Sequence, residues 1–391
     1  MSTAQPDALA GALADDGPLL PAPSAGEDAP DVAADVAVAS QWRLAWWKFR
    51  RHRLALAAGV VVLCIYLVAA FAEFLAPFDP DAYAARYTYA PPQTLHLVQD
   101  GRFAPFVSGY KVQLDAETLR RTFVVDEGVR IPVGLFVHGS AYRLWGLFPA
   151  DLHLFGPLRP GDPMYLWGAD RLGRDMLSRV VFGTRVSMSI GLVGVTLSLL
   201  LGIVLGGLSG YLGGVIDLVI QRVIEFLLAI PTIPLWMGLA AAIPATVPPV
   251  RVYFLITVIL SVIGWTGLAR VVRGRVLAIR NEDFVTAARL DGAGPVTVVL
   301  RHVTPSVASH VIASVTLAIP AMILSETALS FLGIGLRPPV VSWGVLLQEA
   351  QNLRSVATAP WLLLPGAAVI VAVLSLNFLG DGLRDAADPY E

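Results

Sequence analysis

Six apolar stretches, each long enough to cross a lipid bilayer, constrain the fold of this chain more than any other feature. They lie at about residues 54–77, 186–208, 216–242, 252–272, 307–331 and 361–380. A helix of about 20 mostly apolar residues is needed to span the hydrocarbon core. Charged residues make up 15% of the chain, whereas soluble proteins contain roughly 25%. The sequence therefore predicts an all-α polytopic membrane protein with six transmembrane helices.

Composition argues against several functions. The net charge of −2 offers no basic surface for nucleic acid. The lysines are Lys48 and Lys111, and neither follows the glycine-rich loop that cradles phosphates in nucleotide hydrolases. The only cysteine is Cys64, and the six histidines have no metal-binding spacing. We therefore expect no catalytic residues, no metal site and no cofactor in this chain, and no nucleic-acid partner.

The chain divides into four segments. Residues 1–41 are rich in alanine, proline, glycine and acidic residues, a composition typical of a disordered tail. Residues 42–77 join an aromatic, basic stretch to the first apolar span, as expected where a helix leaves the cytoplasm. Residues 78–168 are more polar, and residues 169–391 contain the remaining five spans.

The segment 78–168 is expected to form a β-rich insert outside the membrane, between the first two transmembrane helices. Residues 122–125 and 129–136 have the composition of strands, and Asp126-Glu-Gly between them is a turn signal. We therefore predict a hairpin whose turn lies at residues 126–128.

Arginines indicate the orientation of the spans, because cytoplasmic loops carry an excess of positive charge. Arginines and a lysine precede the first span at residues 43–53, and Arg384 follows the last. The loop between the fourth and fifth spans contains Arg270, Arg273, Arg275, Arg280, Arg289 and Arg301. Both termini and this loop are therefore predicted to be cytoplasmic, which places the insert outside.

The loop between the fourth and fifth spans has the features of a short helix that docks on another protein. Asn281 is suited to cap the helix, and the acidic residues after it favour the positive end of the helix dipole. Ala287 and Ala288 would form a small, flat surface, and Gly292 permits a sharp turn. An ordinary cytoplasmic loop with helical content would account for these residues equally well.

The same segment, 282–305, resembles the coupling helix of binding-protein-dependent ABC importer permeases, which has the pattern Glu-Ala-Ala, three residues, Gly, and later Leu-Pro. Thr286 stands where the pattern has glutamate, and Thr304 where it has leucine. The resemblance implies that the segment contacts a separate ATPase. The residues expected to couple to the ATPase are Glu282, Asp283, Ala287, Ala288, Gly292 and Pro305.

A second motif begins at Gly168 and reads Gly-Ala-Asp-Arg-Leu-Gly-Arg-Asp-Met-Leu-Ser-Arg. Its charged residues recur at helical spacing, which is compatible with i,i+4 ion pairs on an interfacial helix, although the residues alone favour a solvated helix face. The motif is similar to the signature before the second helix in the oligopeptide/dipeptide/nickel subclass of these permeases. The signature residues here are Asp170, Gly173, Arg174, Asp175, Ser178 and Arg179.

Ionisable residues in apolar spans are costly and are therefore functional candidates. Glu225 and Glu326 lie in such surroundings. Trp343 follows the pair Pro338-Pro339 in a segment similar to an external stretch of the permease family. We expect Glu225, Glu326 and Trp343 to lie near the translocation path and to act in gating rather than in direct solute contact.

Small residues recur every four positions along and beyond the second span. Such a face lets membrane helices approach closely, and we favour packing inside this subunit over a seam between subunits. The residues are Ser198, Gly202, Gly206, Gly210 and Gly214.

The resemblance implies the type I ABC importer permease fold and a C-type permease of the bacterial inner membrane. Such a subunit would form a heterodimer with a second permease, within membrane lipid. It would receive solute from an extracytoplasmic solute-binding protein. Two separate P-loop ATPase subunits would use ATP and Mg²⁺ to drive import.

Peptides are the first expectation for the solute, with oligosaccharides or nickel chelates as alternatives in the same importer type. A secondary transporter driven by an ion gradient, with Glu225 and Glu326 as ion sites, is the alternative from another class. The sequence lacks the inverted repeat that many such transporters contain. A membrane-embedded enzyme would need a nucleophile–base pair or a metal site, and the sequence contains no such constellation.

Overall fold

The computed structural model describes residues 41–391, apart from residues 100, 115–120, 245, 304–307 and 388–391. Helix α2 spans Gln41–Arg51, and residues 45–391 form one compact unit.

Five helical stretches among the described residues are long and apolar enough to cross a membrane. In the described part of the chain they therefore account for five of the six predicted spans, and α14 extends the last one to Ala387. They are α3 (Arg53–Ala70), α5 (Met176–Leu212), α8 (Pro249–Ile279), residues 314–331 of α11 (Ala308–Phe331), and residues 360–386, formed by η5 (Pro360–Leu363) and α14 (Leu364–Ala387).

The predicted span 216–242 is a bent pair rather than one straight helix. Helices α6 (Gly214–Ala229) and α7 (Thr232–Ala241) meet at an angle of 90°. Pro231 has no backbone N–H and forces the residue before it out of helical geometry, and Ile230 is indeed extended, with φ −88° and ψ 129°. The count is six spans only if this pair is one of them.

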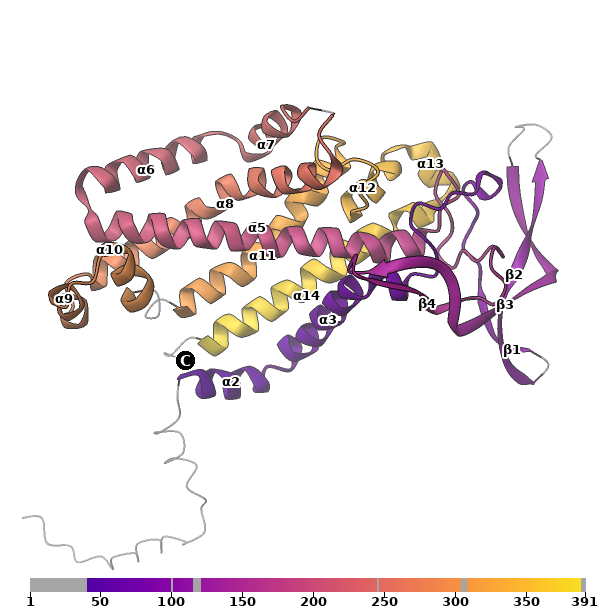
Figure 1. Ribbon diagram of the computed structural model, residues 1–391, viewed down its shortest axis with the longest axis horizontal. Helices are drawn as coiled ribbons and strands as arrows, with labels where there is room; N and C mark the ends of the chain where they lie inside the picture. The colour runs from indigo at the N-terminus through magenta and orange to yellow at the C-terminus, as the bar shows by residue number, and fades with distance from the viewer. Residues whose placement is uncertain (1–40, 100, 115–120, 245, 304–307, 388–391) are drawn as a thin grey trace, which may run out of the picture. The chain divides into compact units, whose positions relative to one another are not determined.

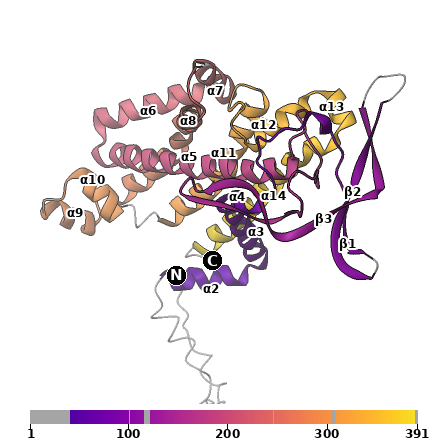
Figure 2. The same cartoon turned by 45° about the vertical axis from the view of Figure 1, so that its right-hand side comes forward.

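The insert contains a four-stranded antiparallel sheet in the order β1-β2-β3-β4. Its strands are β1 (Leu95–Gln99), β2 (Arg102–Leu114), β3 (Arg121–Leu144) and β4 (Phe148–Pro157). Figure 1 shows the sheet at the end of the helices where α5 begins. The short helix α4 (Ala72–Leu75) contacts β3 and β4 and so connects the sheet to the end of α3 (Figure 2).

The predicted hairpin turn at residues 126–128 is wrong, because β3 continues through them. The register between β2 and β3 shifts here: Ser108 pairs with Arg130, but the next residue, Gly109, pairs with Asp126. Residues 127–129 are therefore extra residues in a β-bulge. Asp126 Oδ1 accepts a hydrogen bond from Gly128 N at 3.1 Å. The turn-forming residues stabilise this bulge rather than the end of a hairpin.

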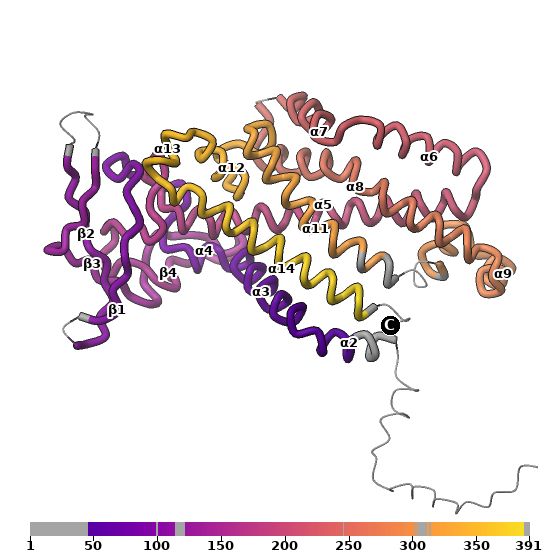
Figure 3. Tube along the Cα trace, turned by 180° about the vertical axis from the view of Figure 1, so that it is seen from behind, coloured from indigo at the N-terminus to yellow at the C-terminus, as the bar shows by residue number. Residues whose placement is uncertain are grey.

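Helix α5 is central and packs against α3, α8 and α11, while α14 packs against α3 and α11; Figure 3 shows α3 and α14 side by side. The predicted small-residue face meets α8. A Cβ atom on Gly206 would lie 2.4 Å from Ala269 O, and one on Gly210 would lie 2.8 Å from Arg273 O. Packing within the subunit is therefore confirmed for this face, although Gly214 lies outside it, since a Cβ atom there would meet no atom within 4 Å.

Candidate functional site

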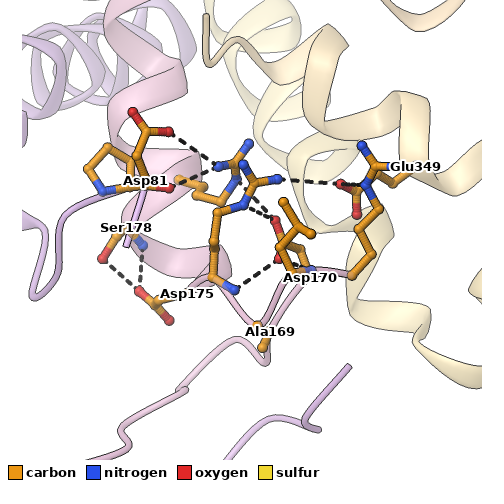
Figure 4. Close-up of polar contacts among 12 residues, drawn as sticks. Asp81, Ala169, Asp170, Asp175, Ser178 and Glu349 are labelled. Carbon is orange, nitrogen blue, oxygen red and sulfur yellow. Dashed lines mark hydrogen bonds and ion pairs between the residues drawn. The ribbon is translucent and has the colours of Figure 1, made fainter. Parts of the chain in front are cut away.

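The signature motif forms a buried ionic cluster centred on Asp170 (Figure 4). Oδ2 of Asp170 accepts a hydrogen bond from Arg174 Nε at 2.6 Å, and Arg179 Nε lies 3.5 Å from the same oxygen. Oδ1 accepts hydrogen bonds from the backbone N–H groups of Leu172 and Arg174 at 2.8 and 2.9 Å. One carboxylate therefore lies between two buried guanidinium groups and closes the turn that precedes α5.

Gly173 is required by this turn. Its φ is +74°, and a Cβ atom at this position would lie 2.0 Å from Ala84 O. Only glycine combines this conformation with such close backbone contact. The turn is thus pressed directly against the segment that leads from α4 into the sheet.

The cluster joins three parts of the chain that are distant in sequence. Nη1 of Arg179 donates a hydrogen bond to Pro80 O at 2.9 Å and lies 3.9 Å from Asp81 Oδ1. The helix η4 (Glu349–Gln351) supplies Glu349, whose Oε1 lies 3.7 Å from Arg174 Nη2 and 3.3 Å from Arg171 Nε. An expected i,i+4 ion pair forms between Asp170 and Arg174. The expectation of an exposed helix face is wrong, because Asp170, Arg174 and Arg179 are buried.

Asp175 is the N-cap of α5. Its Oδ2 accepts hydrogen bonds from Ser178 N and Ser178 Oγ, both at 2.7 Å. Ser178 Oγ in turn accepts one from Phe78 N at 3.1 Å. Burial raises the pKa of the Asp175 carboxyl from 3.8 to about 6; the hydrogen bonds from Ser178 oppose this, and the charge of Asp170 adds to it. Oδ1 of Asp175 has no hydrogen-bond partner in the described structure.

The raised pKa of Asp175 predicts that stability falls as pH rises. Between pH 3.8 and about 6 the folded state holds a proton that the unfolded state has lost, so the free energy of unfolding decreases across this window. Two pKa units correspond to about 3 kcal/mol. We expect Asp175→Asn to reduce this decrease, as measured by the melting temperature in detergent at pH 4.5 and 7. An unchanged difference between the two pH values in the variant would contradict the assignment.

Glu326 and Trp343 belong to one buried polar group near the end of α11. The Glu326 carboxylate accepts hydrogen bonds from Ser330 Oγ and Ser342 Oγ at 2.8 Å and from Ser187 Oγ at 3.3 Å. Ser187 Oγ also accepts one from Trp343 N at 3.1 Å. Helices α5, α11 and α12 (Trp343–Gln348) are thereby held together by a single side chain.

Glu225 lies elsewhere, on α6. Its side chain is exposed and pairs with Arg222 of the same helix at 2.7 Å. The structure therefore brings together Glu326 and Trp343 and leaves Glu225 on the outer face of the bent pair.

Two buried or half-buried ion pairs were not predicted. Arg273 of α8 binds both oxygens of Asp217 on α6, at 2.5 and 2.6 Å. Arg185 of α5 pairs with Glu73 of α4 and donates a hydrogen bond to Ala69 O at 2.8 Å. The sequence shows each residue as an ionisable group beside an apolar span, but nothing in it pairs residues on different elements.

The loop between α8 and α11 contains α9 (Asp283–Leu290), α10 (Pro295–Thr297) and the π-helical η2 (Val298–Val303). The N-cap of α9 is Glu282, without a side-chain cap, rather than the expected Asn281. Gly292 has φ +83° and ends the helix, as Gly292 N donates to Arg289 O and Ala293 N to Ala288 O. Pro305 lies outside the described residues.

Helix α9 has one face on the membrane helices and one face outward. Val285 and Ala288 are buried in a cluster with Val272 and Val276 of α8. Asp283, Ala287 and Gly292 are exposed. Ala288 therefore packs inward, and the expected flat surface of two alanines is reduced to Ala287. The outward face carries Phe284, 43% exposed, and Leu290, 83% exposed.

The fold and these sites define a helical membrane subunit that presents a short helix on a loop between two of its spans. The chain belongs to the family of binding-protein-dependent transport system inner membrane components, whose model matches residues 200–390. The model of the N-terminal transmembrane domain of oligopeptide transport permease C matches residues 40–92. The protein is thus a permease subunit of a binding-protein-dependent transport system.

Similar proteins include two permeases. The chain is 35% identical over 233 residues to a di/tripeptide transport system permease protein of Pseudomonas aeruginosa, covering 59% of this chain and 74% of that protein. It is 29% identical over 353 residues to a glutathione transport system permease protein of Escherichia coli, covering 90% and 91%. Among solved structures, a methionine ABC transporter in inward-facing conformations matches with a TM-score of 0.42 and 18% identity, covering 55% of this chain and 98% of that chain.

Proposed function

We propose that this chain is a transmembrane subunit of an ATP-driven importer of peptides in a bacterial inner membrane. It forms the translocation path with a second, homologous permease and receives the solute from an extracytoplasmic binding protein. Two P-loop ATPase subunits use ATP and Mg²⁺ and dock on the segment 282–305. The relatives named for di/tripeptide and glutathione transport support a peptide solute rather than an oligosaccharide or a nickel chelate.

The exposed apolar face of α9 is the observation that supports contact with an ATPase. Val285 and Ala288 fix the helix to α8, so the helix is held in place without a partner. Leu290 nevertheless remains 83% exposed at its end. An amphipathic helix with apolar anchors on its free face is suited to a hydrophobic groove in another protein.

The orientation follows from the same assignment. An ATPase works in the cytoplasm, so α9 and the arginines of its loop lie inside, in agreement with the positive-inside rule. Both termini are then cytoplasmic, and the sheet of residues 95–157 is outside. Glu326 and Trp343 join α5, α11 and α12 at the end of the helices nearer the sheet, where we assign them a role in gating rather than in solute contact.

The test is Leu290→Asp in the complete transporter. A charge on the outward face of α9 is expected to lower the co-purified ATPase at least tenfold and to abolish uptake of radiolabelled peptide, because a buried unpaired charge is costly. The matched control is Leu353→Asp, since Leu353 is equally exposed, at 86%, in α13 (Leu353–Thr358). The control is expected to retain its ATPase.

Co-purification of the ATPase with Leu290→Asp at the level of the control would contradict docking through α9. Purification of the wild-type chain without any ATPase, combined with solute accumulation driven by a proton gradient, would instead favour a secondary transporter.

A further inference from the structure

Exposed aromatic and apolar side chains gather where the β3–β4 hairpin meets the end of α3. Trp145, Leu147 and Phe148 at the hairpin tip are 52%, 70% and 58% exposed. The Trp145 ring lies 5.8 Å from that of Phe71, which follows α3, and 6.4 Å from that of Phe148. Single exposed apolar residues are ordinary, but a contiguous patch marks an interaction surface.

The turn of this hairpin has a backbone conformation that is unfavourable for the residue types it contains. Trp145 has φ 54° and Gly146 has φ 73°, and the N–H groups of Gly146 and Leu147 donate to Arg143 O and Leu144 O at 3.0 Å. Two successive residues with positive φ form a type I′ turn, where asparagine, aspartate and glycine are preferred. A tryptophan there is strained, and such strain is typical of functional positions.

The depth of the hairpin tip in the membrane follows from its contact with α3. This helix has 18 residues, so it is about 27 Å long, close to the roughly 30 Å of the hydrocarbon core. Because Arg53 begins the helix, Ala70 at its other end lies at the opposite boundary. Trp145 Nε1 donates a hydrogen bond to Ala70 O at 2.7 Å, and Arg185 Nη2 donates to the same oxygen at 3.2 Å.

The exposed surface of α3 leads directly to the hairpin. Leu63, Leu67 and Phe71 are spaced four positions apart and therefore lie on one face, and they are 59%, 48% and 37% exposed. This apolar stripe of a membrane-spanning helix ends at Trp145, and α4 contacts β3 and β4 beside it (Figures 1 and 2).

We propose that the β3–β4 hairpin dips into the phospholipid bilayer beside α3, in the outer leaflet under the orientation given above. Leu147 and Phe148 enter the acyl-chain region, and Trp145 lies at the level of the headgroups, where indole rings are favoured. The insert is then a membrane-anchored domain, held at the bilayer surface by its own hairpin as well as by α3.

The test measures the depth of Leu147 in the assembled transporter, reconstituted in phosphatidylcholine/phosphatidylglycerol nanodiscs. Cys64→Ser removes the only cysteine, after which Leu147→Cys carries an environment-sensitive fluorophore. Phe103→Cys is the matched control, because Phe103 is 74% exposed on β2, a strand that pairs with β1 and β3. We expect lipids with a spin label on the upper part of the acyl chain to quench the Leu147 probe at least threefold more than the control, and aqueous iodide at least threefold less.

Equal quenching of both probes by iodide would place the hairpin in water and overturn the proposal. Protection of the Leu147 probe from iodide and from labelled lipid alike would also overturn it, since a protein partner would then cover the tip. Peptide uptake by sealed vesicles reconstituted with the same variants is a separate readout, so lipid quenching without uptake would weaken the proposed solute and leave the hairpin assignment intact.

Discussion

Replacement of Asp170 by alanine is expected to lower the free energy of unfolding by about 3–5 kcal/mol, the usual cost of removing one partner of a buried ion pair. The side chains of Arg174 and Arg179 are 10% and 3% exposed, so both would keep a buried charge without the carboxylate between them. The backbone N–H groups of Leu172 and Arg174 would lose their acceptor as well. The melting temperature and the folded yield in detergent would measure the loss.

The matched control is Asp81→Ala, which removes the same side chain from the same cluster. Asp81 is 60% exposed and lies 3.9 Å from Arg179, and exposed pairs contribute about 0–1 kcal/mol. Asp170→Asn should lie between the two, since it keeps acceptors for the backbone and removes the charge. Equal losses in the free energy of unfolding for Asp170→Ala and Asp81→Ala would show that Asp170 stabilises the cluster no more than an exposed carboxylate does.

Replacement of Gly206 by leucine is expected to prevent close packing of α5 and α8. The new Cβ would lie 2.4 Å from Ala269 O and 2.7 Å from Ala269 Cα, and backbone atoms cannot rotate away as a side chain can. Overpacking costs about 1–3 kcal/mol and occasionally more, and we expect about 3 kcal/mol or more here. The monodisperse fraction on size-exclusion chromatography and the melting temperature report the effect.

Gly267→Leu is the control for this substitution. Gly267 lies on α8 close in sequence to Ala269, and a Cβ at Gly267 meets no atom within 4 Å. The control should retain wild-type folding. Wild-type behaviour of Gly206→Leu would mean that the two helices are not packed through this seam in the membrane.

Hydropathy predicted the membrane helices well because a bilayer demands long apolar runs, and those runs are visible in the sequence. It missed the bend at Pro231, although the proline itself was the signal. The turn-forming residues 126–128 also led to the wrong prediction of a hairpin turn. A bulge and a turn use the same residues, and only the pairing of β2 with β3 distinguishes them.

The residues of the signature motif were identified from the sequence, but their surroundings were not predicted. Helical spacing suggested that the signature residues pair with one another on an exposed face. In the structure, Arg179 binds Pro80 O, 99 residues away, and Ser187 reaches Glu326 across 139 residues. Contacts between such distant segments depend on the tertiary fold, and spacing within a motif carries no information about them.

Helix α5 is one uninterrupted helix of 37 residues, about 55 Å long, of which the hydrocarbon core covers about 30 Å. It carries the Asp170 cluster at one end and its close seam with α8 toward the other. A rigid rod of this length that pivots by about 5° about one end moves its other end by about 5 Å, roughly one helical turn. A small tilt of α5 about its end near the α9 loop therefore displaces its other end, near the sheet, by several ångströms. No backbone angle within the helix has to change.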